Sequence, residues 1–294
     1  MKRFAIAALA LLATPAAAQG VTPDWRAVSF VGEGDEDSVA MIDMGSLRRP
    51  TATTREIRAA MVSGRPEKLA SGQSVAMTQI VYRVDCTART FTATRTEAWT
   101  SKGKVIASDT PGPARRIEAG SIMEDVRVAI CDGQVTHLRR VPGANPAASA
   151  RELIDQRQSL IDSRGRKGWQ RLTDSGAAPD RLQYFAERGS VIADGAGGKL
   201  VSTMVLIEKG EGGITRIHYL IRIDCKARTG ETMFAQAFGE DGRMLSEVLL
   251  NSGIQPLEPG RMAAALEVPV CKSDWSTGAP EIRLPDQLAR EAFR

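Results

Sequence analysis

The chain has 294 residues, 43% of them hydrophobic and 25% charged, which is enough apolar material for one large or two ordinary domains and excludes wholesale disorder. Its formal net charge of +4 comes without a basic stripe that carries interleaved aromatic residues, so nucleic acid is not an expected partner. The even number of cysteines indicates a protein of an oxidising compartment.

The N-terminal residues 1–18 are predicted to be a secretory signal peptide. Two basic residues precede the apolar run Phe4–Ala13, and the small residues at 16–18 suit a signal peptidase. The run is too short to remain as a membrane-spanning helix, and no later segment is long and apolar enough to span a bilayer. We therefore expect an exported mature protein that begins at Gln19, has no membrane span, and lies in the periplasm or outside the cell.

The acidic run GEGDEDS at residues 32–38 is the first candidate for a ligand site. Its alternating carboxylates, Glu33, Asp35 and Asp37, are of the kind that binds Ca²⁺. The run lacks the glycine and the distal glutamate of a hand-type calcium loop, and nothing like it occurs later in the chain. We therefore expect a solvated loop here and no metal site.

The segment IVYRVDC at residues 80–86 has the alternation of a β-strand with one buried face. Every second side chain, ending with Cys86, is expected to face the core, while Arg83 and Asp85 point outward. The next run, FTATRTEAW, is also β-prone, and VRVAIC at 126–131 is expected to be the closing strand.

The segment 134–167 is predicted to be a helical basic linker. It begins with a turn at Pro142-Gly143, and Ser149–Glu152 fits a capping box that starts a helix. Apolar residues over 153–161 form one stripe of that helix, which is expected to pack on the preceding sheet and to lead into an exposed basic hinge. The alternative is that its excess of Lys and Arg meets an acidic partner or lipid headgroups.

The phrase VYRVDCTART at 81–90 returns as LIRIDCKART at 220–229. Around it, residues 117–131 align without gaps on 257–271, and a tryptophan opens each copy. Agreement over this length indicates that the whole domain occurs twice.

We therefore predict two tandem small domains, residues 19–133 and 168–294, each an antiparallel sheet of about five or six strands. In the second copy, LEVPVC is expected to be an edge strand because Pro269 has no backbone donor. A short C-terminal helix is expected over Pro285–Phe293.

The four cysteines, Cys86, Cys131, Cys225 and Cys271, allow three disulfide connectivities. If each copy is self-contained, the bonds are Cys86–Cys131 and Cys225–Cys271. The alternative, a metal site, would normally need short Cys-x₂₋₄-Cys spacings, and none occurs in the sequence. We therefore expect two disulfides.

Both copies carry the same marker residues. Each opens with Trp-x-x-Val/Leu, contains a strand that ends in Arg-Val/Ile-Asp-Cys followed by Arg-Thr, and closes on a lone cysteine. This pattern, over residues 24–133 and 168–273, resembles the surface-adhesin protein E family of small secreted bacterial domains. The resemblance implies an α+β fold, with an antiparallel sheet and an associated helix in each domain, and a binding rather than a catalytic role.

Residues suited to catalysis are scarce. Histidine is the commonest general base, and the chain has two, His137 in the linker and His218 on a predicted strand. We expect His218 to be a half-exposed strand residue rather than a base. No catalytic residue, cofactor or metal is therefore assigned.

The recurrent outward pairs Arg83/Asp85 and Arg222/Asp224 are the candidate binding residues. The alternative is structural: each Arg and Asp positions its neighbour and the strand end. Exposed ion pairs contribute only about 0–1 kcal/mol, so stability alone is a weak reason for them.

The sequence favours a non-catalytic, adhesin-like binding module of the bacterial cell envelope, with a protein or envelope polymer as its partner. The alternative is a structural or accessory scaffold protein with no ligand affinity of its own. A hydrolase with an unrecognised site is the least favoured, and the sequence predicts no oligomeric state.

Overall fold

The computed structural model describes residues 22–32, 37–69, 72–109, 111–136, 138–141, 146–194, 197–250, 252–259, 262–276, 279–281 and 283–293. Several predictions fall outside these ranges: the signal peptide, the carboxylates Glu33 and Asp35, His137, and the turn at Pro142-Gly143.

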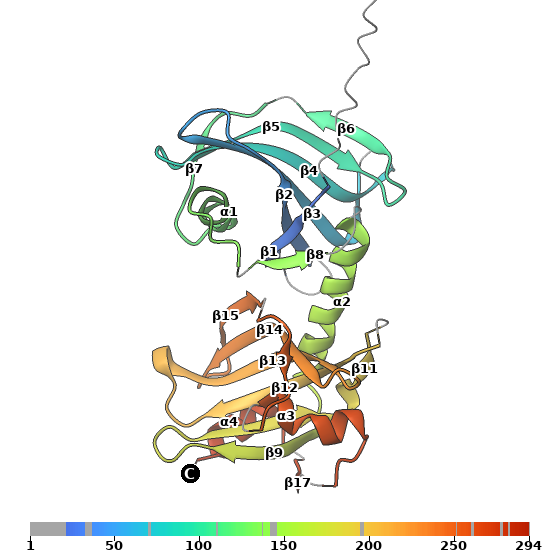
Figure 1. Cartoon of the computed structure of the whole chain (residues 1–294), viewed down its shortest axis with the longest axis vertical. Helices are drawn as coiled ribbons and strands as arrows, with labels where there is room; N and C mark the ends of the chain where they lie inside the picture. Colours follow the sequence, from blue (N-terminus) through green and yellow to red (C-terminus); the bar gives the residue numbers. More distant parts are fainter. Residues whose placement is uncertain are drawn as a thin grey trace, which may run out of the picture.

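The first half of the chain forms an eight-stranded antiparallel sheet (Figure 1). Its spatial order is β6-β5-β4-β3-β2-β1-β8, with β7 paired to β5. Consecutive strands from β1 to β6 are neighbours, and β8 returns the chain to the side of β1. The strands are β1 (Trp25–Val31), β2 (Ser38–Arg48), β3 (Thr54–Lys68), β4 (Ser74–Asp85), β5 (Thr90–Trp99), β6 (Val105–Asp109), β7 (Arg115–Arg116) and β8 (Arg139–Val141).

The second half repeats this plan in a nine-stranded sheet of order β15-β14-β13-β12-β10-β9-β17. Here β17 returns beside β9 as β8 does beside β1, and β11 and β16 pair with β12 and β14. The strands are β9 (Trp169–Ser175), β10 (Leu182–Glu187), β11 (Ile192–Ala193), β12 (Lys199–Ile207), β13 (Ile214–Asp224), β14 (Thr229–Gly239), β15 (Met244–Leu249), β16 (Gln255–Pro256) and β17 (Ala279–Pro280). Five or six strands per copy was too few, because two- and three-residue strands carry no readable alternation.

Three β-bulges recur at equivalent positions of the two sheets. The register shifts after Val81 in β4 and after Leu220 in β13, and again after Ala98 and Ala237 in the neighbouring strands. The third bulge places Val28 of β1, like Leu172 of β9, outside the ladder. Bulges bend a strand locally and are retained within families, so the shared pattern supports a duplicated unit.

The predicted closing strand of the first copy is wrong, because residues 126–131 belong to the helix α1 (Ile122–Cys131). Ser121 caps this helix by accepting a hydrogen bond from the Glu124 backbone N–H. The buried residues Val126, Ala129 and Ile130 stand at helical spacing and lie against the sheet. The valine and isoleucine residues of this segment favour a strand. The segment is nevertheless helical, because its apolar residues form one buried helix face and Ser121 caps the first turn.

The predicted edge strand of the second copy is also wrong. A short helix, α3 (Met262–Ala265), leads into a π-helical turn, η4 (Glu267–Cys271), that contains Pro269. Proline has no N–H for a regular helical hydrogen bond, and the segment around Pro269 departs from regular α-helix geometry. Two single turns, η2 (Arg188–Ser190) and η3 (Glu211–Gly213), and the C-terminal helix α4 (Pro285–Glu291) complete the second half.

The structure contains two disulfides, Cys86–Cys131 and Cys225–Cys271. Each joins the residue after a strand (β4 or β13) to the end of a helical segment (α1 or η4). The molecule is thus mostly β with a few helices, and each disulfide ties a helical segment to the sheet it covers.

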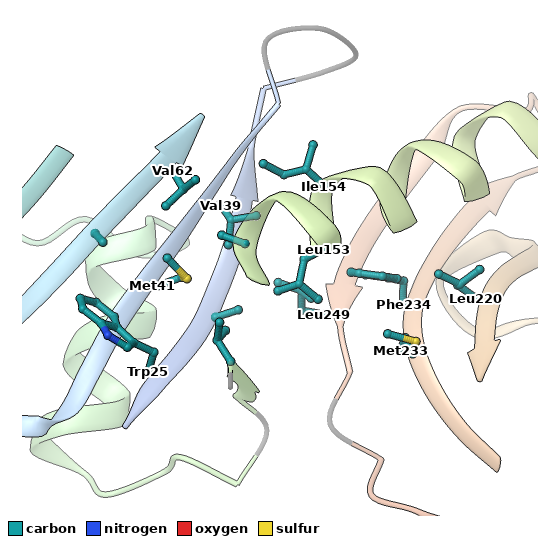
Figure 2. Packing of buried hydrophobic residues seen from close by; sticks show 14 of the residues in the cluster. Trp25, Val39, Met41, Val62, Leu153, Ile154, Leu220, Met233, Phe234 and Leu249 are labelled. Carbon is teal, nitrogen blue, oxygen red and sulfur yellow. The ribbon is translucent and has the colours of Figure 1, made fainter. Parts of the chain in front are cut away.

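The linker helix α2 (Pro146–Ser163) is longer than predicted and lies between the two sheets (Figure 1). It starts at Pro146, before the predicted capping box, because proline is favoured in the first helical turn. Its Leu153 and Ile154 contact apolar residues of both sheets (Figure 2).

One hydrophobic cluster therefore spans the two halves. Val39 and Met41 from the first sheet, and Leu220 and Phe234 from the second, pack around α2 (Figure 2). Separate clusters lie under α1, under α3, and under α4. The prediction that the helix packs on the first sheet alone was incomplete, since the second sheet buries its other side.

Candidate binding sites

Asp85 and Asp224 play the same structural role in the two halves: each stabilises the turn that follows its strand. Oδ1 of Asp85 accepts hydrogen bonds from two backbone N–H groups two and three residues later, at 3.0 and 2.9 Å. Oδ1 of Asp224 accepts the equivalent pair at 3.0 and 2.8 Å. These carboxylates hold the turn that follows the strand, which is the role of an Asx turn.

The two arginines of the recurrent pairs have different surroundings. Arg83 is 55% exposed and lies 3.3 Å from Glu56 on the neighbouring strand. Arg222 is 22% exposed and pairs with Asp194, a carboxylate that is 4% exposed. Arg222 also lines a cavity that lies between the two halves of the molecule.

Arg89 and Arg228, after the disulfide cysteines, both adopt the left-handed conformation with φ of 53°. Arg89 bonds to Glu124 at 2.8 Å, and Arg228 bonds to Glu267 at 2.8 and 3.0 Å. In the aligned sequences Glu267 stands opposite Arg127, so the glutamate has moved by one helical turn while the ion pair has been kept. The pair ties each helical segment to the turn beside it, and the hydrogen bond from Arg228 lowers the pKa of Glu267.

His218 is fully buried, so the expected half-exposed position is wrong. Both faces of β13 are covered: Ile221 and Ile223 lie under α3, while His218 packs edge-on against Trp169 and Phe238. Neither ring nitrogen hydrogen-bonds to any described residue. Burial, with Arg216 and Arg164 nearby, holds the pKa of His218 well below its usual value.

A buried acid faces the first tryptophan of each half, a feature that the sequence reading missed. Trp25 pairs with Asp43 across β1 and β2, and Trp169 pairs with Glu187 across β9 and β10. Asp43 accepts from two backbone N–H groups at 2.8 and 3.1 Å, and Glu187 from one at 2.8 Å. The signal was available, because the acid follows its tryptophan at the same spacing in both copies.

Each half has a groove between a helical segment and its sheet, and the two grooves share two lining positions. In the first half it is a small apolar cavity of about 40 Å³, lined among others by Ala40, Tyr82 and Ile122. In the second half it measures about 400 Å³, and Tyr184 and Met262 occupy the positions of Ala40 and Ile122. The second groove also carries charge, since Arg228 and Glu267 line it.

A buried ion cluster joins the two halves through α2. Arg157, 3% exposed, bonds to Glu247 of β15 at 2.8 and 2.6 Å and pairs with Asp37 at 2.5 Å. Gln236 donates a further hydrogen bond to Glu247 at 2.5 Å. Burial favours a lower pKa for Arg157, but the bonds to Glu247 and Asp37 outweigh it and raise the pKa above its usual value.

The basic residues of the linker are largely paired within the chain. Arg139 lies 2.9 Å from Glu231 of the second sheet, and Arg166 lies 3.3 Å from Glu187. With Arg157 also paired, most of the positive charge that suggested an acidic partner is used to join the linker to the sheets.

In the part of the chain that the structure describes, no group of three or more His, Cys, Asp or Glu side chains is arranged to hold a metal ion. Over the same ranges, no helix has the length and apolar character needed to cross a membrane. No protein-family model matches the sequence, and no curated protein shows significant similarity to it.

Proposed function

We propose that this chain is an exported, non-catalytic binding protein of the bacterial cell envelope, whose tandem repeats hold a protein or an envelope polymer. The observation that carries the proposal is a helix–sheet groove in each half, the two grooves sharing the lining positions Ala40/Tyr184 and Ile122/Met262. Duplication of a binding unit suits this role, because two linked sites raise avidity through effective concentration.

Export is supported by the chemistry of the cysteines. All four are in disulfides, which persist in the periplasm or outside the cell and are rare in the cytosol. The predicted signal peptide at residues 1–18 and the resemblance to surface-adhesin protein E domains favour the same location.

A binding role is favoured over catalysis by the state of the reactive side chains. The cysteines have no thiolate to offer, and His218 is sealed between Trp169 and Phe238 with no exposed surface. A general base must come within hydrogen-bond reach of the proton that it removes, and His218 lacks that access.

The proposal is tested by photo-crosslinking in living cells of the source bacterium. A photoreactive amino acid replaces Met123 beside the first groove, Met262 in the second groove, or the exposed Lys102 as the matched control. We expect one discrete adduct from the two groove positions and none from Lys102. Adducts to the same abundant envelope proteins from all three positions would overturn the proposal and favour the scaffold role.

A further inference from the structure

A third cavity, of about 220 Å³, lies where the linker meets both sheets. Its walls come from β8 and α2 on one side and from β12, β13 and β14 of the second sheet on the other. An apolar cavity of about 150 Å³ holds a benzene molecule, so this one has room for a molecule the size of an amino acid.

The charges on the walls cancel. Three arginines, Arg139, Arg140 and Arg222, face three carboxylates, Glu152, Asp194 and Glu231. Two ion pairs account for four of these groups: Arg139 with Glu231 at 2.9 Å, and Arg222 with Asp194. A ligand with a net charge would leave this balance uncompensated, so the cavity favours a ligand that is neutral overall.

The remaining two groups, Arg140 and Glu152, stand on the same side of the cavity but on different elements, one on β8 and one on α2. Arg140 is 72% exposed and lies 3.3 Å from Asp24, while the exposed Glu152 accepts a hydrogen bond from Gln156 at 3.1 Å. One cation and one anion are thus placed at the cavity with weak partners.

The side-chain amide oxygen of Gln156, which also lines the cavity, lacks a hydrogen-bond donor among the described residues. Because its Nε2 donates to Glu152, its Oε1 is turned away from that carboxylate, and it accepts no hydrogen bond from any described residue. Gln156 is 8% exposed, and a buried amide oxygen without a donor costs free energy. An ammonium group placed beside Glu152 has several N–H donors, enough for the carboxylate and this oxygen together.

We propose that this cavity binds an amino-acid-like zwitterion with a small apolar side chain. Its carboxylate pairs with Arg140, its ammonium group pairs with Glu152 and Gln156, and its side chain contacts the floor formed by Leu153, Leu200 and Met233. The site is made by both halves together, and it does not depend on the two helix–sheet grooves.

The test is calorimetric titration of the full mature chain with glycine, alanine, valine, β-alanine and γ-aminobutyrate at millimolar concentration. This series varies the side chain and the spacing of the two charges. N-acetylalanine and alanine amide each keep one charge, and glycerol has none. We expect alanine or valine to bind at least about tenfold more tightly than any single-charge or uncharged compound, because a hydrogen bond to a charged group is lost in each.

Glu152→Gln and Arg140→Gln should each weaken binding of the zwitterion by about tenfold or more. Both side chains are exposed, so these variants should keep the unfolding midpoint of the parent. Glu118→Gln and Arg116→Gln, exposed positions in the first half, are the matched controls and should bind normally. The proposal is overturned if no zwitterion binds, if glycerol binds equally well, or if the cavity and control variants behave alike.

Discussion

Asp224 shows how a single carboxylate supports the strand end in each half. Its Oδ1 accepts two backbone hydrogen bonds in the turn between β13 and β14, next to the Cys225 disulfide. Asp85 makes the same two bonds in the first half. The recurrence of the two aspartates therefore has a local structural explanation.

Replacing Asp224 by Ala should lower the free energy of unfolding by about 1–2 kcal/mol, because two N–H groups lose their acceptor. Asp224→Asn should lose less, since its amide oxygen can accept the same bonds. Urea denaturation measures both. The exposed Asp155→Ala on α2 is the control and should stay within about 0.5 kcal/mol of the parent. Equal losses at both positions would contradict this role for Asp224.

His218 should make the stability depend on pH. Its folded-state pKa lies well below the unfolded value of about 6.5, chiefly through burial, with Arg216 and Arg164 adding repulsion. Above pH 6.5, where His218 is neutral in both the folded and the unfolded chain, the folded protein has its full stability with respect to this residue. As the pH falls below that value, the unfolded chain binds a proton at His218 and the folded chain does not. The free energy of unfolding therefore declines by up to about 1.4 kcal/mol per pH unit.

The measurement is urea denaturation between pH 5 and 7.5 in a His137→Gln background, so that only one histidine titrates. Adding His218→Leu should flatten the decline, because the unfolded chain then has no histidine to protonate. An unchanged slope in the His218→Leu protein would show that other groups cause the pH dependence.

At the scale of elements, α1 shows where sequence patterns compete. The run over 126–131 is rich in valine and isoleucine, which favour strands, yet Val126, Ala129 and Ile130 are spaced for a helix face. The Ser-x-x-Glu pattern at Ser121 and Glu124 is also a capping-box signature. The cap was readable in the sequence, and it should have outweighed residue propensity.

The burial of His218 was not readable in the same way. Alternation in β13 correctly indicated one buried face with Ile221 and Ile223. Whether the opposite face meets solvent or a second layer depends on where α2 and α4 pack, which is long-range information. The two sheets and the disulfide pairs follow from a repeat within the chain, whereas the cavities depend on packing between repeats.

The helix α2 is held by charge as well as by apolar contact, and Arg157 is its central residue. Arg157→Met should lower the free energy of unfolding by about 3–5 kcal/mol, because the buried Asp37 and the half-buried Glu247 lose their counter-charge. Combining it with Asp37→Asn and Glu247→Gln should recover part of the loss. Chemical denaturation provides the comparison.

The control for this prediction is Arg181→Met, which breaks the Arg181–Glu208 pair at the surface and removes the guanidinium that lies over the Phe293 ring. Its cost should be far smaller than that of Arg157→Met, since solvent screens both charges. A cost for Arg157→Met no larger than this would mean that the buried cluster does not hold α2 in place.

At the scale of the whole molecule, the shared core indicates that the two halves unfold together. Val39 and Met41 of the first sheet and Phe234 of the second belong to one cluster around α2. Calorimetry of the mature chain should show a single transition. The fragment 19–141, deprived of α2, should expose this face, bind a hydrophobic dye and melt at a lower temperature than the full chain.

A fragment 19–141 that melts as it does in the full chain, together with two separate transitions in the latter, would contradict a common core. Calorimetry gives both the melting temperature of the fragment and the number of transitions of the full chain. This result also decides whether isolated halves are meaningful reagents for locating the binding surface.

The packing of α2 into both sheets has a consequence for recognition. If the linker were flexible, the two grooves could bind their targets independently. Because α2 packs into both sheets, it holds the two helix–sheet grooves at one distance and one angle. A partner whose contact points match that distance gains the full benefit of two-point attachment, and a partner with any other spacing gains none. Under the proposed binding role, the fixed spacing of the two grooves would select a target by geometry as well as by chemistry.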